Sequence, residues 1–343
     1  MNTKRLQCMF AYMVAMLFIC FLSGCGNTAY ADIDKEGVSG KSFAIVVKSA
    51  GNENMKKMTE GFREVIEEHG CNVIVKEPSY ATNDQTELVS SLISQNVSGI
   101  SIAVNDPESL ESILSEAKDR GIKITAFDSP AKSGSRSVFV NQADTREIGK
   151  ALVEAVYDLT GGSGQWAVLS STSIAPNQNA WIEAMKTELE NDSKYDNLTL
   201  VDVAYGNDDT EKSKEEVIRL MREYPQLKVI CAPTTIGILA AAETLDDMDT
   251  DIKLTGLGMP SEMSGYVGER CPYMFFWDTQ ALGRLTAYVS LALEGGEITG
   301  QVGETFDAGE LGSYTIKESE DGGTEVVLGS LLKIDKEYMD SCE

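Results

Sequence analysis

Short apolar runs alternate with segments of helical periodicity through the first part of this chain. Each run is five or six residues long and almost continuously apolar, a pattern typical of strands buried on both faces of a parallel sheet. The strand-like runs and helical segments follow one another in the order 42–47, 55–68, 71–75, 87–94, 99–104, 107–120 and 122–127. The short connections between them predict parallel strands, right-handed crossovers and helices on both faces of the sheet.

The alternation then begins again, and the second series predicts a second α/β lobe. Its strand-like runs and helical segments are, in order, 138–140, 145–159, 166–169, 180–190, 198–203, 210–224, 229–232, 236–245 and 252–256. A strongly strand-like run (YMFFW, 273–277) and a helix over 279–293 follow, and the Gly-rich, acidic tail carries a strand candidate at 325–328. A length of 343 residues suits two such domains.

The N-terminus carries the pattern of an export signal. Two basic residues precede an uncharged apolar run over 9–22, which is shorter than the ~20 residues that a membrane-spanning helix needs. The run ends in Leu-Ser-Gly-Cys at 22–25, which resembles a bacterial lipobox and implies a signal peptide over 1–24 and a lipid on Cys25. Residues 25–40 are then interpreted as the lipidated cysteine and a flexible tether. An ordinary signal peptide, or an uncleaved anchor, is the alternative.

Charge and cysteine content narrow the classes of ligand. The formal net charge of −25 argues against nucleic acid as a partner, because binding phosphates needs clustered lysine and arginine. Four cysteines remain after the signal and Cys25 are set aside, at 71, 231, 271 and 342, and their wide spacing includes no Cys-x-x-Cys pair. We therefore expect neither a metal site nor a cofactor.

The sequence offers no set of catalytic residues. The single histidine, His69, lies before Gly70 at the end of a predicted helix and is interpreted as a C-terminal cap. Neither Gly-x-Ser-x-Gly nor His-Glu-x-x-His occurs, and the Gly-Lys-Ser at 40–42 lacks the earlier glycine of a phosphate loop. A repressor of similar fold would need a basic helix-turn-helix where this chain has its signal and acidic tether. We therefore expect a binding protein, not an enzyme.

Polar and aromatic residues follow the predicted strands at their carboxyl ends, the edge at which open parallel sheets bind ligands. The residues placed there are Lys48, Asp128, Asn177, Gln178, Pro233, Thr235, Trp277 and Asp278. Together they offer donors and acceptors for hydroxyl groups and a flat apolar face for ring carbons, the combination that a sugar needs. We predict that they converge on one ligand-binding gap between the lobes.

Each of these residues also has an ordinary structural explanation. The lysine can be a surface residue, and the aspartate of Asp-Ser-Pro can serve only to begin a turn. The amide pair and the residues around Pro233 can simply start the helices that follow, and Asp278 can cap the helix over 279–293. The tryptophan can belong to the core. Their coincidence at the strand ends favours the binding interpretation.

Several longer segments carry a family resemblance. They are AIVVKSAGN, DSP followed by FVNQADTREIG, NQNAWIEAMK, VICAPTTIGILAAAETL, and TGLGMPSEM followed by FFWDTQALG, within about 41–307. With them the chain resembles the type I periplasmic sugar-binding proteins of ABC importers, in the branch of rhamnose-binding proteins and autoinducer-2 receptors. The sequence around PTTIGILAAA resembles the rhamnose-binding proteins more than the autoinducer-2 receptors.

The resemblance implies a fold and a set of contacts. It implies a two-lobe periplasmic-binding-protein type I fold with three crossovers near Val140, Tyr273 and Gly300, so that 41–139 with 276–300 form the N-terminal lobe. The C-terminal lobe would then contain 140–275 with 301–343.

In this branch the residues matching Lys48, Asp128, Asn177, Gln178, Pro233, Thr235 and Trp277 lie at the ligand. Autoinducer-2 receptors have an aspartate at the position of Asn177, and their Pro-x-Ala contact is changed here to Pro233 and Thr235. We expect a monomeric lipoprotein on the outer side of the cell membrane that delivers a sugar to ABC permease subunits. Rhamnose, another deoxysugar or pentose, and autoinducer-2 all remain open as ligands, as does signalling through a membrane sensor.

Overall fold

The computed structural model describes residues 35–78 and 82–342. The predicted signal peptide, the lipidation site Cys25 and the tether up to residue 34 lie outside the described residues. Within the described ranges, no helix is both long enough and apolar enough to cross a membrane. A short helix, α2 (Lys35–Val38), leads into the first sheet.

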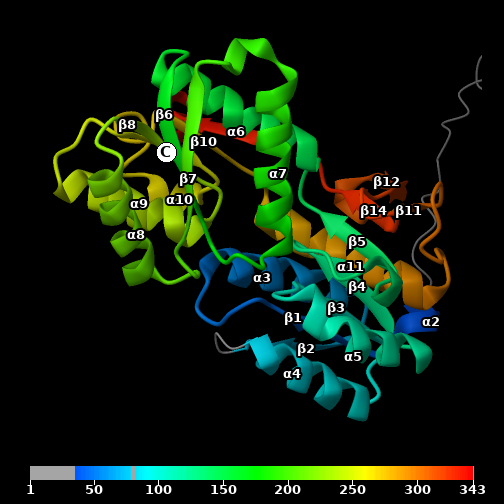
Figure 1. Cartoon of the computed structure of the whole chain (residues 1–343). Coiled ribbons are helices and arrows are strands. Elements are labelled where there is room, and N and C mark those ends of the chain that lie inside the picture. The colour runs from blue at the N-terminus through cyan, green and yellow to red at the C-terminus, as the bar shows by residue number, and fades with distance from the viewer. Residues whose placement is uncertain (1–34, 79–81, 343) are drawn as a thin grey trace, which may run out of the picture. The chain divides into compact units, whose positions relative to one another are not determined.

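Five parallel strands form the centre of the first lobe (Figure 1). They are β1 (Ser42–Val46), β2 (Asn72–Lys76), β3 (Gly99–Ile102), β4 (Lys123–Phe127) and β5 (Val138–Asn141), in the order β5-β4-β3-β1-β2. Helices α3 (Glu53–Glu68) and α11 (Thr279–Gly295) pack on one face, and α4 (Thr82–Ser94) and α5 (Pro107–Asp119) on the other.

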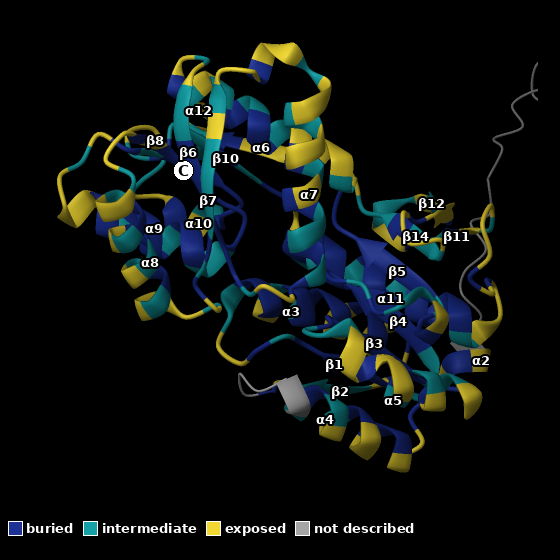
Figure 2. Cartoon of the chain, viewed as in Figure 1, coloured by how far each residue is buried: buried dark blue, intermediate teal, exposed yellow. Residues whose placement is uncertain are grey.

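Burial of this sheet on both faces explains its apolar strands (Figure 2). Phe43 and Ile45 belong to the core that contains residues of α3 and α11, whereas Ala44 and Val46 belong to the core beneath α4 and α5. Successive residues of a strand point to opposite faces, so all four buried positions of β1, from Phe43 to Val46, carry apolar side chains.

Two glycines allow α3 and α11 to cross closely. A Cβ atom at Gly283 would lie 1.9 Å from the Met58 carbonyl oxygen, and one at Gly61 would lie 2.1 Å from that of Gln280. Both contacts are with backbone atoms, which cannot move aside as a flexible side chain can. This crossing holds α11 in the first lobe, more than 200 residues after α3 in the sequence.

A four-stranded parallel sheet forms the second lobe. Its strands are β6 (Gly164–Ser170), β7 (Leu198–Tyr205), β8 (Leu227–Ala232) and β9 (Lys253–Gly256), in the order β7-β6-β8-β9. Helices α6 (Thr145–Thr160) and α7 (Pro176–Asn191) pack together, as do α8 (Thr210–Glu223) and α9 (Thr235–Asp247), and the two pairs flank the sheet (Figure 1). The predicted two-lobe α/β architecture is thus confirmed.

Smaller elements complete the second lobe. They are α10 (Pro260–Met263), β10 (Tyr273–Phe276), β15 (Leu332–Asp335) and α12 (Lys336–Ser341). Strands β10 and β15 pair antiparallel, and a bridge from Leu257 to Phe275 links β10 to the chain leaving β9.

The C-terminal segment corrects one predicted boundary. We placed 301–343 in the second lobe, but β14 (Thr324–Val327) pairs in parallel with β5, and β13 (Lys317–Glu318) pairs with β14. The chain returns to the second lobe only after β14, so the third crossover lies at 328–331 and not near Gly300. A further hairpin, β11 (Thr305–Asp307) with β12 (Ser313–Thr315), precedes these strands.

An ion pair with a buried arginine fastens this segment to the first lobe. The Arg136 guanidinium donates to both carboxylate oxygens of Asp321 at 2.7 Å and to the Ser319 hydroxyl at 3.0 Å. Only 1% of the Arg136 side chain is exposed, so its charge needs this partner.

Candidate functional site

Side chains at the strand ends of both lobes line one cavity, here called the inner cavity. Its volume is about 410 Å³ including its mouth. The first lobe contributes Lys48, Asn52, Asn54, Met55 and Asp128, and the second contributes Asn177, Gln178, Trp181, Asp208, Pro233, Thr234, Thr235, Leu257 and Phe276. Phe276, which the predicted boundary put in the first lobe, belongs to β10, and Trp277, which also lines the cavity, lies in the connection from β10 to α11. Seven of the eight residues singled out from the sequence are among the lining residues.

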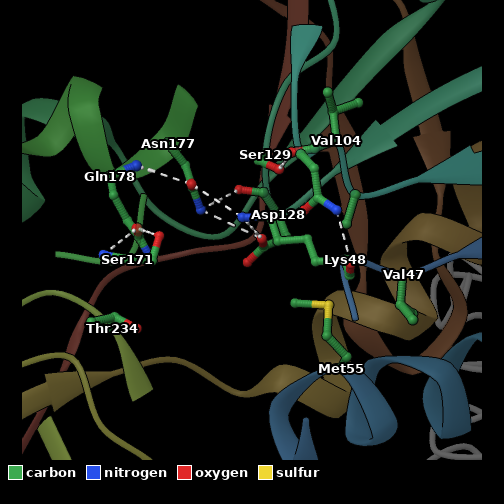
Figure 3. A network of polar contacts seen from close by, with 12 residues as sticks. Val47, Lys48, Met55, Val104, Asp128, Ser129, Ser171, Asn177, Gln178 and Thr234 are labelled. Carbon is green, nitrogen blue, oxygen red and sulfur yellow. Dashed lines mark hydrogen bonds and ion pairs between the residues drawn. The ribbon is translucent and has the colours of Figure 1, made fainter. Parts of the chain in front are cut away.

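A polar network in this cavity spans the two lobes (Figure 3). The Lys48 ammonium lies 3.0 Å from an Asp128 carboxylate oxygen and donates to the Asn177 side-chain oxygen at 3.2 Å. The Asn177 amide donates in turn to the Asp128 backbone carbonyl at 3.2 Å. Lys48 and Asp128 follow β1 and β4 of the first lobe, whereas Asn177 lies in the first turn of α7. The three groups therefore meet only when the lobes approach each other.

The backbone at Asp128 adopts a conformation that is uncommon for residues other than glycine. Its φ is +58°, and the Ser129 N–H donates to the Phe127 carbonyl at 2.5 Å across a three-residue turn. The Ser129 hydroxyl fixes the turn by donating to the Val104 carbonyl at 2.6 Å. Such a backbone costs about 1–3 kcal/mol and tends to occur at functional sites. The Asp-Ser-Pro sequence thus makes a turn and also directs a carboxylate into the cavity.

The side chain of Gln178 is held by neighbouring groups of the second lobe. Its oxygen accepts from the Ser171 N–H at 3.2 Å and from the hydroxyls of Ser170 and Ser171. Among the described residues, its Nε2 donor has no partner. Gln178 therefore presents an oriented donor at the cavity.

Three aromatic side chains form an apolar wall of the cavity. The rings of Phe276 and Trp277 stack with centroids 5.1 Å apart, and Trp181 lies 6.0 Å from Trp277. Trp277 is 5% exposed, and its indole N–H has no hydrogen-bond partner among the described residues. The side-chain oxygen of Asn54, in the first turn of α3, likewise has none. An unpaired buried donor and an unpaired buried acceptor cost about 1–3 kcal/mol each, so both favour a ligand with hydroxyl groups.

A model of the periplasmic binding protein domain family matches residues 43–298. The chain belongs to this family. Its members are solute-binding proteins and not enzymes. Among solved structures, the chain is similar to an ABC transporter solute-binding protein from Clostridium phytofermentas with bound L-rhamnose, at 45% identity and a TM-score of 0.87, over 89% of this chain and 98% of the other.

Two further solved structures extend the comparison. A sugar ABC transporter protein from Actinomyces odontolyticus is 34% identical, with a TM-score of 0.70, over 88% of this chain and 97% of the other. LsrB from Clostridium saccharobutylicum, in complex with AI-2, is 19% identical with a TM-score of 0.81, over 88% and 99%, and shares the fold. The family membership expected from the sequence is therefore confirmed.

One predicted site residue of this periplasmic binding protein has another role. Asp278 is exposed, does not line the inner cavity, and accepts a hydrogen bond from the Ala281 N–H at 2.9 Å as the N-cap of α11. Its carboxylate is oriented by the helix that it caps, which corrects its assignment to the ligand. His69 ends α3 as predicted, and its Nδ1 lies 2.7 Å from the Val65 carbonyl oxygen.

The residue most clearly missed from the sequence is Asp208. It follows β7 with a φ of +52°, and it accepts a hydrogen bond from the Thr234 hydroxyl at 3.1 Å. Desolvation in the cleft raises the pKa of its carboxyl group, while the charge of Lys48 opposes that rise. The strand-end rule that identified Asp128 also identifies Asp208, because Gly206-Asn207-Asp208 follows a strand in the same way.

Proposed function

We propose that this protein is an extracytoplasmic sugar-binding lipoprotein of an ABC importer, with L-rhamnose or a similar monosaccharide as its ligand. The observation that carries the proposal is the inner cavity, where hydroxyl-reading groups of both lobes surround an aromatic wall. The bound L-rhamnose of the 45%-identical Clostridium phytofermentas protein supports this choice of sugar.

The residues divide the recognition of a sugar between them. The carboxylates of Asp128 and Asp208 accept hydrogen bonds from sugar hydroxyls, while Lys48 and the Gln178 amide donate to them. Trp277 covers the apolar face of the ring with its own ring and donates from its indole N–H. A sugar that lacks one of these hydroxyls leaves a buried group unpaired, which gives the site its selectivity.

Closure of the lobes follows from the same contacts. A ligand that binds groups of both lobes at once has its highest affinity for the closed form, so it shifts the population of conformers towards closure. The closed form then presents both lobes together to the permease subunits. Transport thereby depends on ligand without any chemical change of the ligand.

The N-terminal sequence supports a location of this receptor at the membrane. We propose that 1–24 direct export and that a lipid on Cys25 holds the monomeric protein at the outer face of the cell membrane. Acyl chains anchor a protein there without spanning the bilayer. Replacing Cys25 with serine in the full chain should release the protein from the membrane fraction, and unchanged retention would contradict the anchor.

Thermal unfolding of the mature domain with candidate sugars tests the ligand. At 100 times its dissociation constant, a true ligand stabilises the protein by about 2.7 kcal/mol. We expect this shift with L-rhamnose and a smaller one with D-arabinose and D-glucose. If autoinducer-2 alone stabilised the protein, the receptor class would stand but its ligand would be a signal molecule. If none of these compounds did, the sugar proposal would be wrong.

A further inference from the structure

A second cavity adjoins the inner one, and we call it the outer cavity. Its volume is about 530 Å³ including its mouth, compared with about 410 Å³ for the inner cavity. Lys48 and Asp208 line both, so these two side chains form the boundary between them. Both volumes include space that is open to solvent.

The outer cavity also takes its walls from both lobes. Ser49 follows β1 of the first lobe, whereas Thr172 and Asn207 follow β6 and β7 of the second. The Asn207 N–H donates to the Ser171 carbonyl at 2.8 Å, so the loops after β6 and β7 are tied together. A group bound here would therefore contact both lobes and would add to the energy of closure.

The lining suits a neutral hydroxylated group. The side chains of Ser49, Thr172 and Asn207 offer two hydroxyls and an amide, and none of the three has a hydrogen-bond partner among the described residues. Ile174, 46% exposed, adds an apolar surface. Charge is confined to the boundary residues Lys48 and Asp208. No aromatic ring of the described residues lines the outer cavity, so hydrogen bonds must dominate there.

We propose that the outer cavity is a second subsite, which takes a neutral sugar unit joined to the monosaccharide in the inner cavity. The ligand class is then a disaccharide or a similar hydroxylated glycoside. The inference rests on the proposed function, because the first unit must occupy the inner cavity. Lys48 and Asp208 then lie beside the linkage between the two units.

Calorimetric titration with defined sugars tests the subsite. The probes are L-rhamnose and the α-1,2-, α-1,3- and α-1,4-linked rhamnobioses, titrated into the mature protein. We expect at least one disaccharide to bind ten times more tightly than L-rhamnose. Thr172→Trp, which fills the outer cavity, should weaken that disaccharide at least tenfold and change L-rhamnose less than twofold. Thr172→Ser keeps the hydroxyl and should change neither.

A second variant removes a polar group without adding bulk. Asn207 has a φ of +57°, a conformation that glycine adopts freely, so Asn207→Gly removes the amide and keeps the loop. Asn207→Gly should also weaken binding of the disaccharide and leave binding of L-rhamnose unchanged. If L-rhamnose bound and every disaccharide bound more than tenfold more weakly, the second subsite would be refuted and the proposed function would stand. If no sugar bound, both the second subsite and the proposed function would be refuted.

Discussion

Two ion pairs, Arg136–Asp321 and Lys48–Asp128, are built in opposite ways. Arg136 lies within one lobe and holds Asp321 with two parallel hydrogen bonds of 2.7 Å. Lys48 meets Asp128 through one contact of 3.0 Å, and its other partner, Asn177, belongs to the other lobe.

The surroundings of the two pairs differ as well. The Asp321 carboxylate also accepts hydrogen bonds from the Ser319 hydroxyl and the Gly323 N–H within its own hairpin. Around Lys48–Asp128 the Asp128 backbone has a positive φ, and the unpaired Trp277 N–H and Asn54 oxygen line the same cavity. A bidentate pair within one lobe stabilises the fold, whereas a single contact beside unpaired polar groups leaves capacity for a ligand.

The largest expected effect is on binding, at Asp128. Asp128→Ala should weaken L-rhamnose binding by about 30-fold or more, because removing one member of a buried, hydrogen-bonded charge pair costs about 2–5 kcal/mol. Calorimetric titration measures this loss, and circular dichroism checks that the fold is retained. The matched control is Asp321→Ala, which should leave the affinity within twofold. Equal losses of L-rhamnose affinity in Asp128→Ala and Asp321→Ala would contradict the distinction between the two ion pairs.

The next effect is on stability, at Asp321. Asp321→Ala should lower the free energy of unfolding by about 2 kcal/mol, less than for a fully buried pair because solvent reaches the Asp321 side chain. Arg136 would be left buried without its counterion. Urea denaturation measures this change. A loss at Asp128→Ala as large as that at Asp321→Ala would mean that both pairs are structural.

The pH dependence of stability should report the same pair. Burial alone raises the pKa of Asp321, but hydrogen bonds from Arg136 and Ser319 lower it to about 2, compared with 3.8 ordinarily. A carboxyl whose pKa is lower in the folded state stabilises the fold above its unfolded pKa, and this contribution disappears as the pH falls from about 4 to 2. The unfolding temperature of the unchanged protein should therefore approach that of Asp321→Asn over this range. A gap that stayed constant with pH would contradict the assignment.

The smallest effect concerns the indole N–H of Trp277. Trp277→Phe keeps an aromatic face and removes the unpaired donor, so it should weaken L-rhamnose about tenfold, in line with about 1.5 kcal/mol for one hydrogen bond. Trp166 is also buried, and its N–H has no hydrogen-bond partner within the described part of the chain. It does not line the inner cavity, so Trp166→Phe serves as the control for binding. Equal affinity in Trp277→Phe and the unchanged protein would show that the sugar does not use this donor.

Much of the fold and most of the cavity could be predicted from the sequence. Strands such as β1 are buried on both faces, so their apolar runs are continuous, and the residue after each run, such as Lys48, is easy to locate. Asp208 escaped because β7 is only partly buried, and the Asn-Asp-Asp after it looks like an ordinary polar turn. Local pattern finds a strand end most readily where burial is complete on both sides.

The C-terminal segment shows where local pattern fails. The strand at 324–327 was anticipated, but its pairing with β5 depends on contacts about 185 residues apart and on the Arg136–Asp321 ion pair. The prediction for Asp278 fails for a different reason, since an aspartate suits both a helix cap and a contact with a sugar. Only the three-dimensional position of its carboxylate decides between them.

A crystal structure of the mature protein grown with L-rhamnose tests the central claim most directly. The account predicts one sugar in the inner cavity, with hydrogen bonds to Lys48 and Asp128 from one lobe and to Asn177 or Gln178 from the other, against the ring of Trp277. A sugar bound elsewhere, or held by the residues of a single lobe, would contradict it.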